Sequence, residues 1–164
     1  MKSNIYPTAV QDGWRVTHLG RLLGHAMRRF DERVLTLMAH DVQVPLALSN
    51  LAAKAQISAA HIHLMRHLAL SGSRLVDLAA SAGMSKQAMA HLVAQCEAWG
   101  LVEKSADSRD ARAKQIVFTA LGLQWLGGFE RAVQRAEAEF TQEVGADIAT
   151  VVKIGLEAYA NAYA

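Results

Sequence analysis

The segment from Leu75 to Phe118 reads LVDLAASAGMSKQAMAHLVAQCEAWGLVEKSADSRDARAKQIVF and decides the fold. It opens with a short apolar helical pattern that closes at Gly83. Ser85 is a helix N-cap residue, and Gly100 occupies the position where a left-handed residue ends a helix. Two short helices joined by a tight glycine-bearing turn predict a helix-turn-helix.

The second helix of this pair has two different faces. Its spacing places an apolar set inward: Met89, Leu92, Val93 and Cys96. It places a polar set outward: Lys86, Gln87, His91 and Gln95. A helix fits the major groove of DNA, and the residues of its N-terminal turns reach the base edges. The outward face is therefore a candidate for reading DNA.

The period changes after this helix. Leu101–Lys104 and Lys114–Phe118 alternate as strands do, and they flank a polar loop, Ser105–Ala113, with Arg112 at its tip. A strand, a charged loop and a returning strand directly behind a helix-turn-helix predict a winged helix.

Long amphipathic helices flank this unit. One apolar stripe runs from Leu19 to Met38, and Thr119 caps a second long helix that Gly145 interrupts. A third stripe runs from Ile148 to Tyr163. This apolar area exceeds what one small winged helix can cover, so we expect a homodimer. The fold class is mainly α, a winged helix-turn-helix with long N- and C-terminal dimerisation helices.

Composition agrees with one helical domain. Of 164 residues, 52% are hydrophobic and 20% charged, the net charge is +2, and a single cysteine excludes an internal disulfide. No apolar run approaches the roughly 18 residues of a membrane span, and the start lacks a secretory signal. We expect a cytoplasmic protein without a membrane partner. No catalytic motif is present, so we expect neither an enzyme nor a cofactor.

Five motifs carry a family resemblance, in this order: Leu78–Ala79, Met84–Gln87, Gly100–Val102, Asp110–Lys114 and Leu121–Gly122. In this order and spacing the chain resembles the multiple-antibiotic-resistance regulator (MarR) family of bacterial transcription factors. It departs at Phe118, where leucine is usual. The resemblance implies one domain over 1–164, with a DNA-binding lobe at 57–118 and dimerisation helices at 18–40 and 119–164. It also implies a transcriptional repressor that a small-molecule effector releases from a double-stranded DNA operator.

The DNA-binding candidates lie on the recognition helix and the wing. On the helix they are Ser85, Lys86, Gln87 and His91, and Gln87 suits adenine because an amide matches its donor and acceptor. On the wing they are Arg109, Arg112 and Lys114. The resemblance implies that Asp110 orients the wing while Arg112 enters the minor groove. Arginine suits narrow minor grooves, where negative potential is concentrated.

The effector candidates are His25 and Arg29, beside the apolar stripe of the first long helix. In the family, an effector pocket lies between the dimerisation helices and the DNA-binding lobe and often takes small aromatic carboxylates. Arg29 with His25 would bind such an anion. The alternative is that both side chains face water or the partner subunit.

Two other function classes stay open. His63 and His67 stand four residues apart, as metal-binding pairs do, but no third ligand joins them in the sequence, so we assign no metal site. Cys96 lies on the inward stripe, where a thiol is inert, so redox sensing is not indicated. A metal- or redox-sensing regulator is one alternative, and a winged-helix protein–protein interaction module is the other.

Overall fold

The computed structural model describes residues 13–45, 50–51, 56–107 and 110–161, with the side chains of 107 and 110–112 left aside. Its elements, in chain order, are α1 (Gly13–Thr17), α2 (Leu19–Ala39), α4 (Ala59–His67), α5 (Leu75–Ser81), α6 (Lys86–Ala98), β1 (Val102–Asp107), β2 (Asp110–Phe118), α7 (Ala120–Val144) and α8 (Ala146–Asn161). Mainly helical structure around one small hairpin confirms the predicted winged helix-turn-helix.

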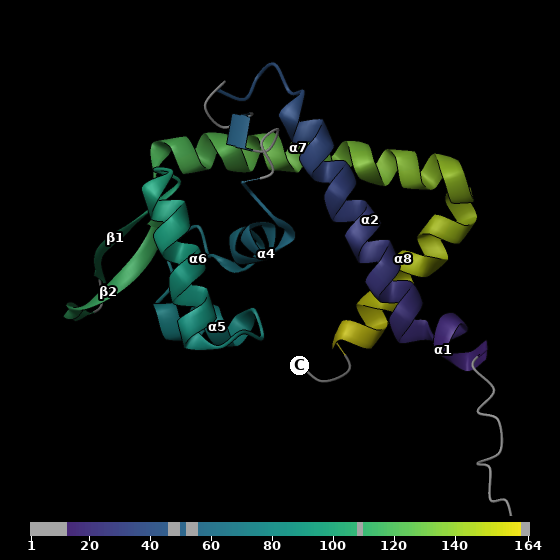
Figure 1. Ribbon diagram of the computed structural model, residues 1–164, viewed down its shortest axis with the longest axis horizontal. Coiled ribbons are helices and arrows are strands. Elements are labelled where there is room, and N and C mark those ends of the chain that lie inside the picture. Colours follow the sequence, from purple (N-terminus) through teal and green to yellow (C-terminus); the bar gives the residue numbers. More distant parts are fainter. Residues whose placement is uncertain (1–12, 46–49, 52–55, 108–109, 162–164) are drawn as a thin grey trace, which may run out of the picture.

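The long helix α7 connects two parts of the molecule. In Figure 1 it runs along the upper edge, with α4, α5, α6 and the hairpin below one half. The helices α2 and α8 lie below the other half, and α2 rises past the middle of α7 (Figure 1). Within the described residues, no helix is both long and apolar enough to cross a membrane.

The helix boundaries follow the predicted caps. The Ser85 hydroxyl accepts from the backbone N–H of Ala88 at 3.2 Å, and Gly100 ends the next turn with a φ of 71°. The Thr119 hydroxyl accepts from the N–H of Gly122 at 2.9 Å, which opens α7. Gly145, with a φ of 90°, separates α7 from α8. These local signals therefore place the helices correctly.

The wing differs from the prediction. β1 and β2 pair antiparallel from Val102 opposite Phe118 to Asp107 opposite Asp110. The predicted loop Ser105–Ala113 is wrong, because both strands continue through it almost to the end of the hairpin. Arg112 accordingly lies within β2 and not at a loop tip. Backbone pairing satisfies N–H and C=O groups whatever the side chains are, so a polar, charged segment extends a solvated hairpin readily.

The core lies beneath the recognition helix. Met89, Leu92, Val93 and Cys96 of α6 are all buried, as their spacing predicts. A short bridge between Ser73 and Ile116 adds a third backbone segment beside the hairpin, with two hydrogen bonds of 2.8 and 3.0 Å. α6 is therefore held on one side by the core, which leaves its other side to solvent.

The start of α7 touches the end of the lobe at backbone distance. A Cβ on Gly122 would stand 1.9 Å from the carbonyl oxygen of Leu101. The hydroxyl of Thr119 donates to the carbonyl of Gly100 at 2.5 Å, one residue earlier. Only glycine allows this approach, which joins the winged helix to the long helices.

We predict that Gly122→Ala lowers the free energy of unfolding by more than about 2 kcal/mol, because rigid backbone must move to admit the methyl group. Urea denaturation measures the loss. Gly127→Ala, on the same helix, is the control: its Cβ meets only the Arg131 side chain, at 3.7 Å. The control should be neutral or stabilising by about 0.4–1 kcal/mol. Equal effects of the two variants would contradict the close contact.

Candidate nucleic-acid interface

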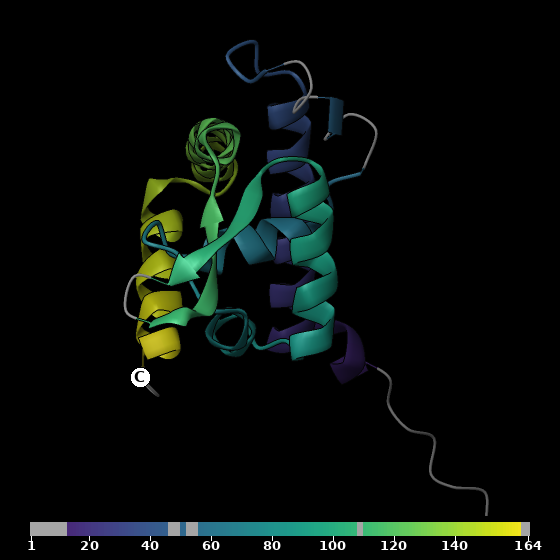
Figure 2. The same ribbon diagram turned by 90° about the vertical axis from the view of Figure 1, so that its left-hand side faces the viewer.

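The exposed polar residues of the recognition helix gather at its first turns. Ser85, Lys86, Gln87 and His91 are all exposed, while the opposite face of α6 is buried. In both views, the start of α6 and the closed end of the hairpin lie toward the lower side of the lobe (Figures 1 and 2). The structure thus presents helix and wing on one side, an arrangement suited to a helix in the major groove.

The predicted wing residues are only partly described. Lys114 is exposed on β2, and Lys104 of β1 pairs with Glu97 of α6 at 2.6 Å. Arg109 lies outside the described residues. Asp110 and Arg112 lie in β2, in the part whose side chains are not described. The wing therefore remains a prediction at those three positions.

A buried histidine positions the recognition helix. His61 of α4 is 5% exposed and lies 4.8 Å, ring to ring, from Trp99. Its Nδ1 accepts from the backbone N–H of Ser58 at 3.1 Å, and its Nε2 donates to the Gln95 side chain on α6 at 3.0 Å. The prediction that Gln95 points outward is wrong: it is half-buried, because the His61 ring offers it a partner across the helix interface.

The neutral form of His61 is the one that fits these contacts, because Nδ1 must keep a lone pair to accept. Burial lowers the pKa of His61 below 6.5, and the positive field of His91 adds to this, while the hydrogen bond to Gln95 works in the opposite direction. Sequence reasoning missed this residue because its partner is 34 positions away.

An ion pair joins the lobe to the first long helix. Arg66 of α4 donates to the buried Asp31 carboxylate of α2 at 2.6 Å, and its guanidinium stands 5.8 Å above the Phe129 ring of α7. Trp125 stacks on Phe129 at 5.3 Å, and its indole N–H is buried without a partner among the described residues. Three helices thus converge on one guanidinium. No local pattern in the sequence indicates this contact.

The effector candidates lie near a groove between α2 and α7. The groove measures about 730 Å³ and is lined by Arg29, Phe30 and Phe140 among others. Arg29 pairs across it with Glu143 at 2.5 Å. His25 is exposed and does not line this groove. The structure therefore brings Arg29, but not His25, to the groove wall.

The alternative sensors find little support. His63 donates to the carbonyl of Ala82 at 2.8 Å, with the His67 ring 4.7 Å away, and the described residues contain no cluster of three or more metal-ligating side chains. Cys96 is fully buried, and burial raises the pKa of its thiol to about 12. The prediction that this thiol lies inward in an inert setting is confirmed.

Comparison with known proteins identifies the lobe. A model of the MarR family matches residues 55–113. The winged-helix lobe belongs to the MarR family. The resemblance seen in the sequence is thereby confirmed, and the matched residues span α4 to β2, including the whole recognition helix of this MarR lobe.

Solved MarR-family and related structures share the fold over nearly the whole chain. One is the transcriptional repressor CouR bound to a 23-mer DNA duplex: 20% identity, 94% of this chain and 100% of that one, TM-score 0.69. CouR from Rhodococcus jostii bound to p-coumaroyl-CoA gives 16%, 93%, 94% and 0.60. The PcaV regulator from Streptomyces coelicolor with its natural ligand gives 18%, 96%, 100% and 0.60. No curated protein sequence shows significant similarity to this chain.

We predict that His61 makes stability depend on pH. Because its pKa is lower in the folded protein than in the unfolded chain, its contribution is complete above about pH 6.5 and is lost as the pH falls through the folded-state pKa. His61→Gln should flatten that part of the curve. Urea unfolding between about pH 5 and 8 measures it.

The control for this measurement is His25→Gln, which changes an exposed histidine. It should keep the wild-type slope, and His67, whose pKa is also lowered by burial, stays in both variants. A wild-type slope in His61→Gln would show that the buried ring does not govern the acid limb.

Proposed function

We propose that the chain is a homodimeric DNA-binding transcriptional repressor, released from its operator by a small-molecule effector. The observation that carries this is the exposed polar face of α6, presented by a MarR-family lobe with its opposite face buried in the core. DNA-bound CouR, which shares the fold, supports the same use of the helix.

Base reading is assigned to the first turns of α6. A helix fits the roughly 12 Å major groove, where the Gln87 amide pairs with adenine and Lys86 reaches guanine or phosphate. Ser85 caps the helix, and His91 lies one turn further along the exposed face. The wing is assigned to the minor groove.

On the wing, we propose that Arg112 enters the minor groove, with Arg109 and Lys114 on the phosphates and Asp110 orienting the hairpin. Arg112 lies two residues from the start of β2, close enough to the closed end to project past it. Arginine displaces condensed counterions there as well as reading groove width.

Dimerisation is supported by apolar side chains that the single chain leaves uncovered. α8 buries none of its residues. The exposed set on α1, α2 and α8 includes Trp14, Leu19, Leu22, Met27, Ile148, Val151, Ile154 and Tyr159. Such a continuous surface marks an interface, and a two-fold axis through it sets two recognition helices about 34 Å apart, one turn of DNA.

The effector is assigned to the groove at Arg29, with His25 one helical turn before it. Ligands such as p-coumaroyl-CoA occupy a relative with this fold. An aromatic carboxylate would draw Arg29 from Glu143, and a ligand that prefers one relative position of the helices shifts the equilibrium between DNA-binding and released states.

We predict that light scattering at micromolar concentration gives twice the chain mass of 17.8 kDa. Val151→Asp should shift the protein toward the monomer, because it places a charge in the apolar surface of α8. Gln124→Asp, at an exposed position of α7, is the matched control and should stay dimeric. A monomeric wild type would rule out the dimer and the two-groove mechanism.

We predict that Gln87→Ala weakens binding to the cognate operator by about 1–3 kcal/mol and leaves affinity for scrambled DNA nearly unchanged, because an amide contact to a base carries sequence information. Gel shifts on both DNAs measure this. Gln124→Ala, the same change on α7, should bind like wild type. An absence of DNA binding in the wild type would favour the protein–protein interaction module instead.

A further inference from the structure

The helices α2 and α7 run side by side in opposite directions, joined by a ladder of ion pairs. The rungs fall four residues apart on each side: Arg29 with Glu143 at 2.5 Å, Arg33 with Glu139 at 2.6 and 2.7 Å, and, past the end of α2, Asp41 with Arg131 at 2.7 and 3.0 Å. The hydrogen bonds from Arg33 lower the pKa of Glu139, so this rung is ionised at neutral pH. The spacing leaves one position of the ladder between the second and last rungs.

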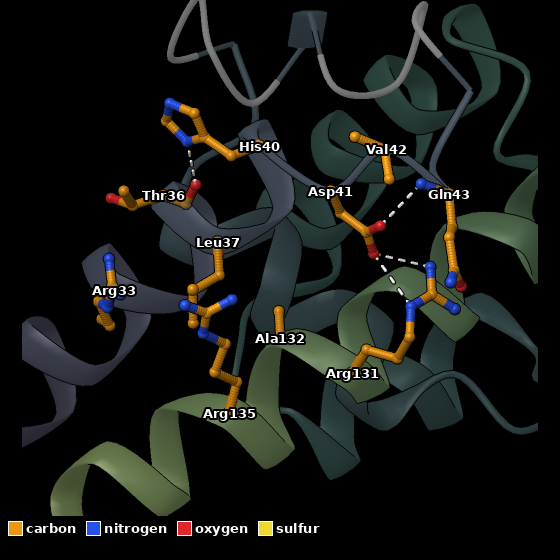
Figure 3. Close-up of a pocket in the computed structure, with 10 residues that line it drawn as sticks. All are labelled: Arg33, Thr36, Leu37, His40, Asp41, Val42, Gln43, Arg131, Ala132 and Arg135. Carbon is orange, nitrogen blue, oxygen red and sulfur yellow. Dashed lines mark hydrogen bonds and ion pairs between the residues drawn. The ribbon is translucent and has the colours of Figure 1, made fainter.

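At that position the ladder lacks an acid. The step of four residues places Leu37 on α2 opposite Arg135 on α7, and both line the same groove (Figure 3). Arg135 lies 3.5 Å from Glu139, whose two oxygens already accept shorter bonds from Arg33. Its side chain is 70% exposed. One guanidinium is thus in excess over the carboxylates of the ladder.

The groove around this position is basic at its walls and apolar at its floor. It measures about 550 Å³, and Arg33, Arg131, Arg135 and His40 line it together with one carboxylate, Asp41. Burial works to raise the pKa of Asp41, but hydrogen bonds from Gln43 and Arg131 outweigh it and lower that pKa. Asp41 is therefore ionised and committed to Arg131. The apolar lining includes Leu37 and Ala132, on either side of Arg135 (Figure 3).

We propose that this groove binds a small organic oxyanion, a phosphate or carboxylate on an apolar body. The oxyanion takes the place of the missing acid opposite Arg135, and the apolar part packs on Leu37 and Ala132. A guanidinium offers two parallel N–H donors to such a group, which makes the contact directional as well as ionic.

This site is separate from both surfaces assigned above. The passing point of α2 and α7 lies at the upper edge in Figure 1, whereas the first turns of α6 lie at the lower edge, so DNA on α6 does not reach the groove. Of the residues lining the Arg29 groove, only Arg33 and Thr36 also line this one. The inference goes beyond the proposed function and does not depend on it.

The experiment is calorimetric titration of the full chain, without DNA, with phenyl phosphate, benzoate and inorganic phosphate. Phenyl phosphate or benzoate should bind more tightly than inorganic phosphate, because only they carry an apolar part; which of the two binds distinguishes phosphate from carboxylate chemistry. Arg135→Gln should weaken binding about tenfold or more. Arg28→Gln, an exposed arginine of α2 that does not line the groove, should bind like wild type.

A second pair of variants tests the missing acid directly. Leu37→Glu supplies the carboxylate from the chain itself and should abolish binding of the oxyanion, because Arg135 is then paired internally. Leu37→Gln removes the same apolar side chain without adding a charge and should retain measurable binding. Thermal melts of all variants establish that each is folded.

Three results would overturn the proposal: no binding of either aromatic anion up to about 10 mM, unchanged affinity in Arg135→Gln, or equal affinity in Leu37→Glu and Leu37→Gln. Loss of binding in Arg29→Gln but not in Arg135→Gln would assign the anion to the Arg29 groove, which overturns this site and leaves the proposed function standing. Failure of the operator experiment would leave the anion site unaffected.

Discussion

The carbonyl of Leu101 and the backbone of α7 meet at Gly122, in a space that a Cβ would fill, with its centre 1.9 Å from that oxygen. The rest of the structure depends on this contact. Leu101 lies between the recognition helix and the hairpin, and α7 carries α2 and α8. Because backbone packs on backbone, the junction has little freedom to yield. A change in the position of the long helices is therefore passed to the lobe as a movement of the whole unit.

The charged groups between the two parts act in different ways. The Arg66–Asp31 pair is largely buried, and removal of one partner from such a pair costs several kcal/mol. The pairs of the α2–α7 ladder are largely exposed, and exposed pairs contribute about 0–1 kcal/mol each. We infer that the buried pair fixes the lobe on α2, whereas the ladder sets the register of α2 on α7 and exchanges partners at little cost. A ligand for one of its arginines then competes with a weak interaction.

The recognition helix shows how local and tertiary effects combine at the candidate site. Its N-cap serine, its buried face and its exposed residues all follow from a spacing of a few residues, so the sequence predicts them. Its orientation also depends on His61, which joins α4 to Gln95 across 34 positions of the chain. The extent of the wing was misjudged at Ser105–Ala113 because strand pairing is set by the partner strand and not by the polarity of the side chains.

The sequence by itself determined the mainly helical fold, the caps at Ser85, Thr119 and Gly145, the exposed face of α6 and the family resemblance. Each of these rests on residues close together in the chain, where backbone geometry and periodicity dictate structure. Only the tertiary structure decided that Arg135 faces Leu37 and not an acid. That pairing depends on the register of two antiparallel helices nearly a hundred residues apart, and no local rule connects such positions: side-chain packing along the whole interface sets it.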